Sequence, residues 1–153
     1  GPLYAAFGLE RTKDNTSNDD LSAYRIATRY TFAKVFSLGA LFENMDKGDA
    51  NQLTRNAYMV NAGINLSQST QIKLEYIQAE DYDQSTETGA YSIVLGLNQK
   101  LGKTTSIYLV GVSTTNDDFA SYGISQDGVG DPARAGTPGG DVVAFSIGVD
   151  QKF

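Results

Sequence analysis

The sequence predicts an all-β protein, an antiparallel up-and-down transmembrane β-barrel with about eight strands in a single segment over residues 1–153. Apolar and polar residues alternate with period two along most of the chain, and period 3.6 is weak. The connections between the alternating stretches are short and long in turn. Sixteen glycines, nine tyrosines and seven phenylalanines, against only three prolines, fit strands joined by tight turns.

The first half of the chain contains four alternating stretches, at residues 3–10, 21–32, 35–43 and 54–66. In each stretch one face is apolar and rich in aromatic residues, whereas the other carries Ser, Asn, Gly, Ala, Arg and Glu. In the second stretch, for example, Tyr24, Ile26 and Tyr30 share the apolar face, and Arg25 and Arg29 share the polar face. A strand places successive side chains on opposite faces, so each stretch predicts one two-faced strand.

The second half repeats this pattern at residues 71–78, 90–99, 105–113 and 142–153. Residues 105–113 are apolar at both odd and even positions, so their faces are not assigned. In the last stretch an apolar row shares one face, and the terminal aromatic residue falls on the same parity: Val143, Phe145, Ile147, Val149 and Phe153. Chain ends are usually polar and frayed, whereas this pattern predicts an end that is held in place.

The connections predict that the two ends of the sheet differ. Short links lie at residues 33–34, 67–70 and 100–103, and long polar links lie at 11–20, 44–52, 79–89 and 114–141. In an up-and-down meander every second connection lies at the same end, so tight turns gather at one end and acidic loops at the other. Membrane barrels have this asymmetry. An even number of strands places both termini at the turn end.

Period-two alternation alone fits two environments. In a membrane barrel the apolar face meets lipid and the polar face lines water, whereas in a soluble β-sandwich or lipocalin-like barrel the apolar face points inward. The alternating loop lengths, the polar face rich in Gly and Ala, and the final Phe153 favour the membrane. Two aromatic belts are then expected, with Tyr30, Phe32 and Phe36 near the turns and Tyr24, Tyr58, Tyr82 and Tyr91 near the loops.

The chain end GVDQKF resembles the carboxyl terminus of Gram-negative general porins of the β-proteobacterial type, which end on Phe after a Gly-apolar-polar-polar-basic run. The opening GPLYAAFGLE resembles an internal porin strand that follows an NGPL-like turn. The resemblance implies the carboxyl-terminal half of a sixteen-stranded, trimeric porin in the outer membrane of a Gram-negative bacterium. It also implies that the outer-membrane insertion machinery reads the final strand, through Val143, Phe145, Ile147, Val149 and Phe153.

In a porin wall the inward residues line a water channel, where charged side chains set ion selectivity. Arg25 and Arg29 lie four residues apart on one strand, about 13 Å along it. In the porin family a basic ladder on the wall faces acidic groups on a loop that constricts the pore. The predicted pore-lining and selectivity residues are Arg25, Arg29, Arg55, Lys73, Glu43 and Glu75. The alternative is that they are ordinary solvated residues with little individual effect.

The long links are acidic, with Asp14, Asp19, Asp20, Asp46, Asp49, Asp81, Asp83, Asp117, Asp118 and Asp127. Clustered carboxylates bind Ca²⁺ through oxygen ligands, so Ca²⁺ that bridges these loops to lipopolysaccharide is the one cofactor considered. None of these links has the spacing of a calcium-binding loop, and solvated surface loops are the simpler interpretation. The net charge of −6 argues against nucleic acid as a partner.

Three functions compete. The first is a passive diffusion channel for small hydrophilic solutes and ions, formed by a porin fragment. The second is a complete eight-stranded barrel with a filled interior and a structural or adhesion role, and the third is a soluble ligand-binding barrel. No enzyme is predicted, because the chain has neither His nor Cys. A fragment has two open strand edges, so it must close on itself, pair with a second copy or be held by a missing amino-terminal half.

Overall fold

All eight predicted strands form in the computed structural model, which describes residues 1–13, 20–48, 53–124 and 137–153. Four of the acidic loop positions, Asp14, Asp19, Asp49 and Asp127, lie outside these residues. The strands are β1 (Leu3–Lys13), β2 (Asp20–Phe32), β3 (Phe36–Asp46), β4 (Thr54–Asn65), β5 (Thr70–Ala79), β6 (Ala90–Lys100), β7 (Thr105–Asn116) and β8 (Val142–Gln151).

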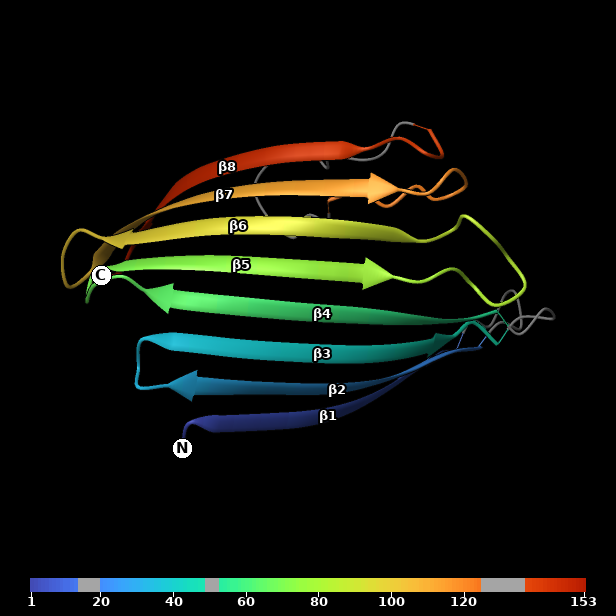
Figure 1. The fold of residues 1–153 in the computed structure, drawn as a ribbon, viewed down its shortest axis with the longest axis horizontal. Helices are drawn as coiled ribbons and strands as arrows, with labels where there is room; N and C mark the ends of the chain where they lie inside the picture. Colours follow the sequence, from blue (N-terminus) through green and yellow to red (C-terminus); the bar gives the residue numbers. More distant parts are fainter. Residues whose placement is uncertain (14–19, 49–52, 125–136) are drawn as a thin grey trace.

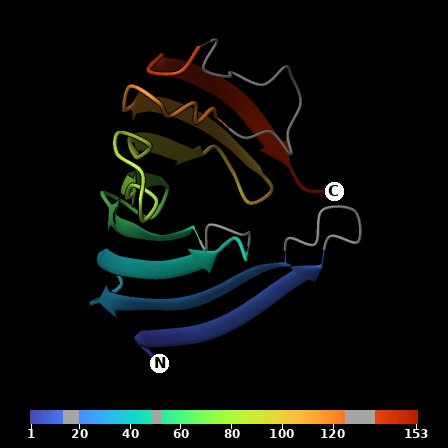
Figure 2. The same cartoon turned by 90° about the vertical axis from the view of Figure 1, so that its right-hand side faces the viewer.

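The eight strands form one antiparallel sheet in chain order, β1 to β8. The sheet curves into an open trough (Figure 2), and among the described residues β1 and β8 do not pair with each other. The chain is therefore not closed into an eight-stranded barrel, and both outer strands present free edges. Both termini lie at the end with the short turns, as the even strand number predicts (Figure 1).

The register assigns the two faces of the trough. Phe7 pairs with Ile26 and Ile26 with Phe42, and directly opposed residues share a face. These apolar rows form the convex face, whose side chains are exposed. The register also settles the faces of β7, which the sequence left open. Leu109 pairs with Ile147 on the convex face, whereas Tyr108 lies on the concave face opposite Gly148.

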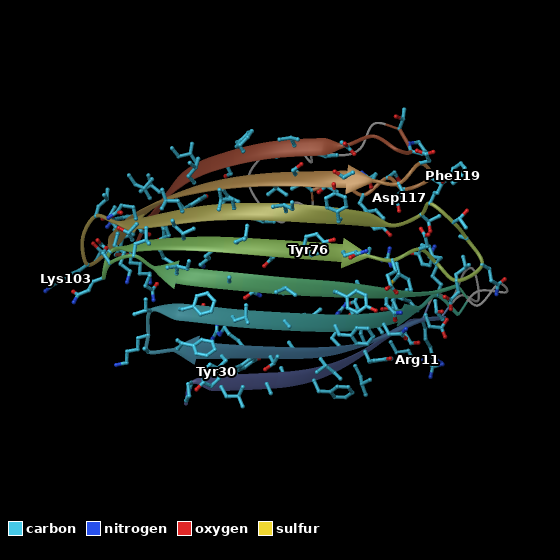
Figure 3. The ribbon with its side chains drawn as sticks, viewed as in Figure 1. Arg11, Tyr30, Tyr76, Lys103, Asp117 and Phe119 are labelled. Carbon is cyan, nitrogen blue, oxygen red and sulfur yellow. The ribbon has the colours of Figure 1, made fainter. Side chains whose placement is uncertain are left out.

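Two rows of aromatic rings cross the convex face. At the loop end Phe42 lies 5.9 Å from Tyr24 and 5.4 Å from Tyr58, and Tyr76 stacks on Tyr91 at 6.1 Å, all between ring centroids. At the turn end the ring of Phe32 contacts the rings of Tyr30 and Phe36, at 4.5 and 5.6 Å. Figure 3 shows Tyr30 toward the turn end and Tyr76 nearer the middle of the sheet. An apolar band between two aromatic rows is typical of a sheet that crosses a bilayer.

A polar row on the same face lies beyond the loop-end aromatic row. Asn44 Nδ2 donates to Asn56 Oδ1 at 2.9 Å, and Asn56 Nδ2 donates to Glu80 Oε2 at 3.0 Å. These side chains mark the edge of the apolar band. Within the described ranges, no helix has the length and apolar character needed to cross a bilayer.

The strands extend further into the long connections than the alternation indicates. β1 continues through Lys13 and β3 through Asp46, so Asp46 is a strand residue and not part of a loop. The reason is that backbone pairing continues after the apolar pattern has ended, for example between Asp46 and Thr54. Period-two hydrophobicity records only the part of a strand that has one apolar face, and the strand itself is longer.

Candidate functional site

The concave face is the candidate site, because it gathers the polar side chains of all eight strands on one curved surface. A hollow in its middle is lined by side chains from β2 to β7, among them Arg29, Asn61, Lys73, Glu75 and Val110. Small residues keep this hollow open, because Lys73 lies between two glycines, Gly63 on β4 and Gly96 on β6. The six predicted pore-lining residues all lie on this face, in different surroundings.

Arg25 lies between two carboxylates. Its Nη1 is 2.8 Å from Glu10 Oε2 on β1, and its Nε donates to Glu43 on β3. Glu43 was predicted on this face, and the register places it directly opposite Arg25. Glu10 completes the cluster from the other neighbouring strand. Two carboxylates and one guanidinium leave this cluster with one net negative charge, so Arg25 does not present a free positive charge to the concave face.

Arg29 and Lys73 have no such partners. No carboxylate among the described residues lies within 4.0 Å of either cation. The Arg29 guanidinium lies 5.9 Å from the ring centroid of Tyr4, a cation–π contact that leaves its charge uncompensated. Glu75 lies opposite Asn61 on β4 and Val94 on β6, and it makes no ion pair within the described part of the chain. The middle of the concave face therefore carries two uncompensated cations and one uncompensated carboxylate.

Arg55 is enclosed by tyrosines at the loop end of β4. Its Cζ lies 4.9 Å from the ring centroid of Tyr82 and 5.2 Å from that of Tyr122, and its Nη1 donates to the Tyr122 hydroxyl. Lys47 Nζ lies 5.1 Å from the Tyr82 centroid. The prediction that Tyr82 belongs to the loop-end belt is wrong, because this ring contacts a residue of the concave face. Tyr76, on the convex face of β5, lies in the belt instead.

The loop between β5 and β6 is organised by one carboxylate. Asp81 Oδ1 accepts hydrogen bonds from the backbone N–H groups of Thr88 and Gly89, at 2.6 and 2.8 Å. The hydrogen bond from the Thr88 backbone is the main cause that lowers the pKa of the Asp81 carboxyl below its ordinary value, because it stabilises the charged form. Asp83 accepts a hydrogen bond from the hydroxyl of Thr54. These loop carboxylates therefore have structural partners.

Metal binding by the loops stays a prediction. Across residues 1–13, 20–48, 53–124 and 137–153, no three side chains of the metal-binding types are grouped closely enough to hold an ion.

The predicted assembly signal lies on the convex face of the edge strand β8. Val143, Phe145, Ile147 and Val149 are 61–81% exposed and form a continuous apolar row. Phe153 lies beyond the last residue of β8 and is fully exposed. Their role as a signal stays a prediction.

Sequence reasoning missed two contributors to the concave face. Tyr122 lies in a connection with no alternation, and nothing in its surroundings indicates that it reaches Arg55, which is 67 residues away in the chain. Asn116 ends β7, and its side chain holds the backbone of Tyr122. Asn116 lies within a run of six polar residues, 113–118, so the sequence does not single it out or identify its partner.

Comparisons with known proteins agree with this architecture. The model of the Gram-negative porin family matches residues 1–118. Outer membrane porin protein 32 of Delftia acidovorans is 28% identical over 133 residues, which cover 84% of this chain and 37% of the relative. The solved anion-selective porin from Comamonas acidovorans superimposes with a TM-score of 0.86 at 22% identity, over 100% of this chain and 46% of that one. The chain thus spans less than half the length of either protein.

Proposed function

This chain belongs to the family of Gram-negative porins, and from that premise we propose that its concave face is part of the wall of a passive diffusion channel for small hydrophilic solutes and ions. Its place is the outer membrane. Porins are channels, and we propose no catalytic role for this chain.

One observation carries the proposal: between the two aromatic rows, the large apolar residues are on the exposed convex face, and the charged residues are on the concave face. Phe145, Ile147 and Leu9 are each more than 70% exposed on the convex side. Arg29 and Lys73 line the hollow on the concave side. A soluble barrel has the opposite arrangement, because its apolar side chains fill the interior. Only a sheet with lipid outside and water inside is stabilised by this distribution.

The open edges of β1 and β8 require partners in the membrane, because unpaired backbone groups are costly in hydrocarbon. We propose that further strands pair with both edges and complete a wider barrel. The chain spans 46% of the solved porin, which supports strands from the rest of one barrel over a second copy of this chain. We further propose that complete barrels form homo-oligomers.

The uncompensated charges support a preference for anions. Arg29 and Lys73 face the hollow without a carboxylate partner, and Glu75 is the one uncompensated carboxylate near them within the described part of the chain. Rings of like charge on a channel wall favour the passage of the opposite ion. The relative from Comamonas acidovorans is described as anion-selective, and we propose the same sign of selectivity here.

The test is the reversal potential of the full-length protein in a planar bilayer under a salt gradient. We expect Arg29→Met and Lys73→Met each to lower the anion-to-cation permeability ratio by about twofold or more, because each removes a wall charge in a narrow space. Glu75→Gln should raise the ratio.

Lys103→Met is the matched control. Lys103 lies in the turn between β6 and β7, at the end of the sheet (Figure 3), so this variant loses the same charge away from the hollow. Its permeability ratio should remain that of the parent protein. Equal shifts in all three cation variants would contradict wall selectivity, and the absence of conductance would contradict the channel.

Three partners follow from the convex face and the loops. We propose that outer-membrane lipid covers the apolar band, and that the insertion machinery recognises the exposed row on β8. The acidic loops lie at the lipopolysaccharide side, where Ca²⁺ ions bridge carboxylates such as Asp117 and Asp118 to lipid phosphates.

A peptide with the sequence of residues 142–153 should compete with the full-length protein for the insertion machinery, and Phe153→Ala should abolish that competition.

A further inference from the structure

A segment of the connection between β7 and β8 crosses the concave side of the sheet. We name residues 117–124 the mouth segment. Its Tyr122 contacts Arg55 on β4, although the sheet places β5 and β6 between β4 and β7. Strands lie about 4.8 Å apart, so the contact spans about 14 Å of the sheet. The segment starts after Asn116 at the end of β7 and reaches Arg55 on β4. Both residues belong to rows of the concave face, so the segment runs on that side of the sheet.

The course of the mouth segment is fixed by hydrogen bonds at both ends. Asn116 Nδ2 donates to the carbonyl oxygens of Tyr122 and Gly140, at 3.0 and 2.8 Å, and Asn116 Oδ1 accepts from the Tyr122 N–H at 2.7 Å. The N–H of Phe119 donates to the carbonyl oxygen of Glu87, in the connection between β5 and β6, at 2.8 Å. The segment is therefore bound to the end of β7 and to the β5–β6 connection before it reaches β4.

Arg55 forms the contact at the far side. Its planar guanidinium lies within cation–π distance of Tyr82, from the β5–β6 connection, and of Tyr122, from the mouth segment. It also donates a hydrogen bond to the hydroxyl of Tyr122. One side chain of β4 thus joins both loops to the wall. A lysine cannot reproduce this, because its ammonium is a compact charge without a planar face.

Side chains near the mouth segment have low exposed fractions. Four residues at the loop ends of β6, β7 and β8 are buried: Ala90, Thr114, Asn116 and Val142. Ala120, in the mouth segment itself, is buried as well. Further along the concave face of β8, Ser146 is exposed. Thr114 is 3% exposed, and its hydroxyl lies 2.8 Å from that of Ser92 on β6. We attribute the remaining cover of this side chain to the mouth segment, which begins directly after Asn116, the last residue of β7.

We propose that Arg55 is a positioning residue that fastens the mouth segment across β5 and β6 and thereby sets the width of the channel entrance on the loop side. The channel entrance rests on the proposed function, whereas the fastening does not. Arg55 was predicted from the sequence as a selectivity residue, and this proposal gives it a different role. Its charge is directed into two tyrosine rings and away from the hollow that Arg29 and Lys73 line.

The experiment measures how fast a buried thiol reacts. The chain has no cysteine, so Thr114→Cys places a single, nearly isosteric thiol beneath the mouth segment. The full-length protein, free of other cysteines and held in outer-membrane vesicles, is treated with a neutral, water-soluble methanethiosulfonate reagent. The reaction rate of a neutral reagent depends on its access to the thiol and is not changed by the loss of the Arg55 charge. We expect Arg55→Met to raise the rate at this thiol by about tenfold or more, because local opening governs access to buried groups.

A thiol at an uncovered place is the control. Ser146→Cys lies on the concave face outside the cover, and its rate should change by less than about twofold in Arg55→Met if only local opening has changed. Arg55→Lys retains the charge and should still raise the rate at Thr114→Cys. Tyr122→Ala should reproduce Arg55→Met and leave β4 unaltered, and Tyr122→Phe, which keeps the ring, should have a smaller effect.

Three results would overturn the proposal: an unchanged rate at Thr114→Cys in Arg55→Met, a normal rate in Arg55→Lys, or an equal rise at both thiols. No ion flow is measured in this experiment. The absence of anion preference in the bilayer experiment would therefore leave its result intact, and the two failures are distinguishable.

Discussion

The two ends of the sheet are held together in different ways. At the turn end short links close through backbone hydrogen bonds between near neighbours, such as Val35 N to Phe32 O at 2.9 Å and Leu101 N to Thr105 O at 2.9 Å. At the loop end side chains far apart in the sequence hold the structure, as Arg55 does with Tyr122. The turn end thus has links that close locally, although side chains of neighbouring strands also contact them, as Asn65 Nδ2 donates to Lys34 O at 2.8 Å. At the loop end a single contact reaches across two intervening strands, β5 and β6, and forms only when these strands are in place.

This difference has a consequence for single substitutions. A backbone hydrogen bond survives most changes of side chain, so the turn end should tolerate substitution wherever the backbone conformation is allowed. A long-range side-chain contact is lost with the one residue that makes it. The largest effects of single substitutions are therefore expected at the loop end, and the smallest at the turns.

Asn116→Ala should have the largest effect. This buried side chain makes three hydrogen bonds to backbone groups, and its removal leaves the N–H and carbonyl of Tyr122 without their partner. We expect the free energy of local opening of the mouth segment to fall by about 2–3 kcal/mol, because buried polar groups without partners are costly. Hydrogen exchange at the Tyr122 amide measures this change.

The matched control is Asn98→Ala, on the neighbouring strand near the turn end. Asn98 is half-buried on the concave face, and no side-chain hydrogen bond ties it to the described residues. Its removal should change hydrogen exchange in the mouth segment and in the turns by less than about 0.5 kcal/mol. Comparable effects of the two substitutions would remove the distinction between the ends of the sheet.

A second, smaller effect concerns pH and the connection between β5 and β6. Hydrogen bonds from Thr88 and Gly89 lower the pKa of the Asp81 carboxyl below its ordinary value of 3.8. A lowered pKa in the folded state means that the stabilisation is fully present above pH 3.8 and is lost as the pH falls through the lowered pKa. We expect the protection of the Thr88 and Gly89 amides against hydrogen exchange to fall several-fold in acid.

Asp81→Asn provides the sharper form of this prediction. The variant should show the weakened protection already at neutral pH, and the acid-dependent change in that loop should be absent. Asp118→Asn removes the same charge from the mouth segment and should leave the Asp81 loop unaltered. An acid response that persists in Asp81→Asn would assign the pH dependence to another carboxylate.

The same difference between the two ends explains how much the sequence predicts. Eight strands, the two faces of seven of them and the positions of the short turns follow from the sequence, because in those seven strands one face meets a uniform environment over its whole length. The surroundings of the predicted charged residues do not follow. Glu10 and Glu43 reach Arg25 from two different strands, and only the register brings them together.

The errors have the same physical origin. Tyr82 has the composition and position of a belt tyrosine, yet its ring contacts Arg55 on the other face, because a loop has no period to fix the direction of its side chains. Residues 105–113 are apolar on both faces, and their pairing with β8 decides which side meets lipid. A sequence pattern predicts features that recur along a strand in a uniform environment. A contact between two single residues far apart in the chain can be identified only from the folded structure.

The smallest effect is expected at the turn between β2 and β3, and it has the opposite sign. Ala33 and Lys34 have φ angles of 46° and 61°, in the left-handed region that disfavours residues with a Cβ atom. They are the two central residues of the turn that the hydrogen bond from Val35 N to Phe32 O closes. Positive φ at both central positions is the mark of a type I′ turn, which prefers Gly at the second of them. We expect Lys34→Gly to stabilise the protein by about 0.5–1 kcal/mol, since the relief of strain exceeds the added entropy of the unfolded chain.

The urea concentration at half-unfolding in detergent micelles measures the gain. Lys34→Ala, which removes the charge and keeps the strain, should leave the midpoint unchanged. Equal midpoints for the two variants would mean that this turn is held by its neighbours, among them the Asn65 side chain that donates to the Lys34 carbonyl oxygen, and not by its own conformation.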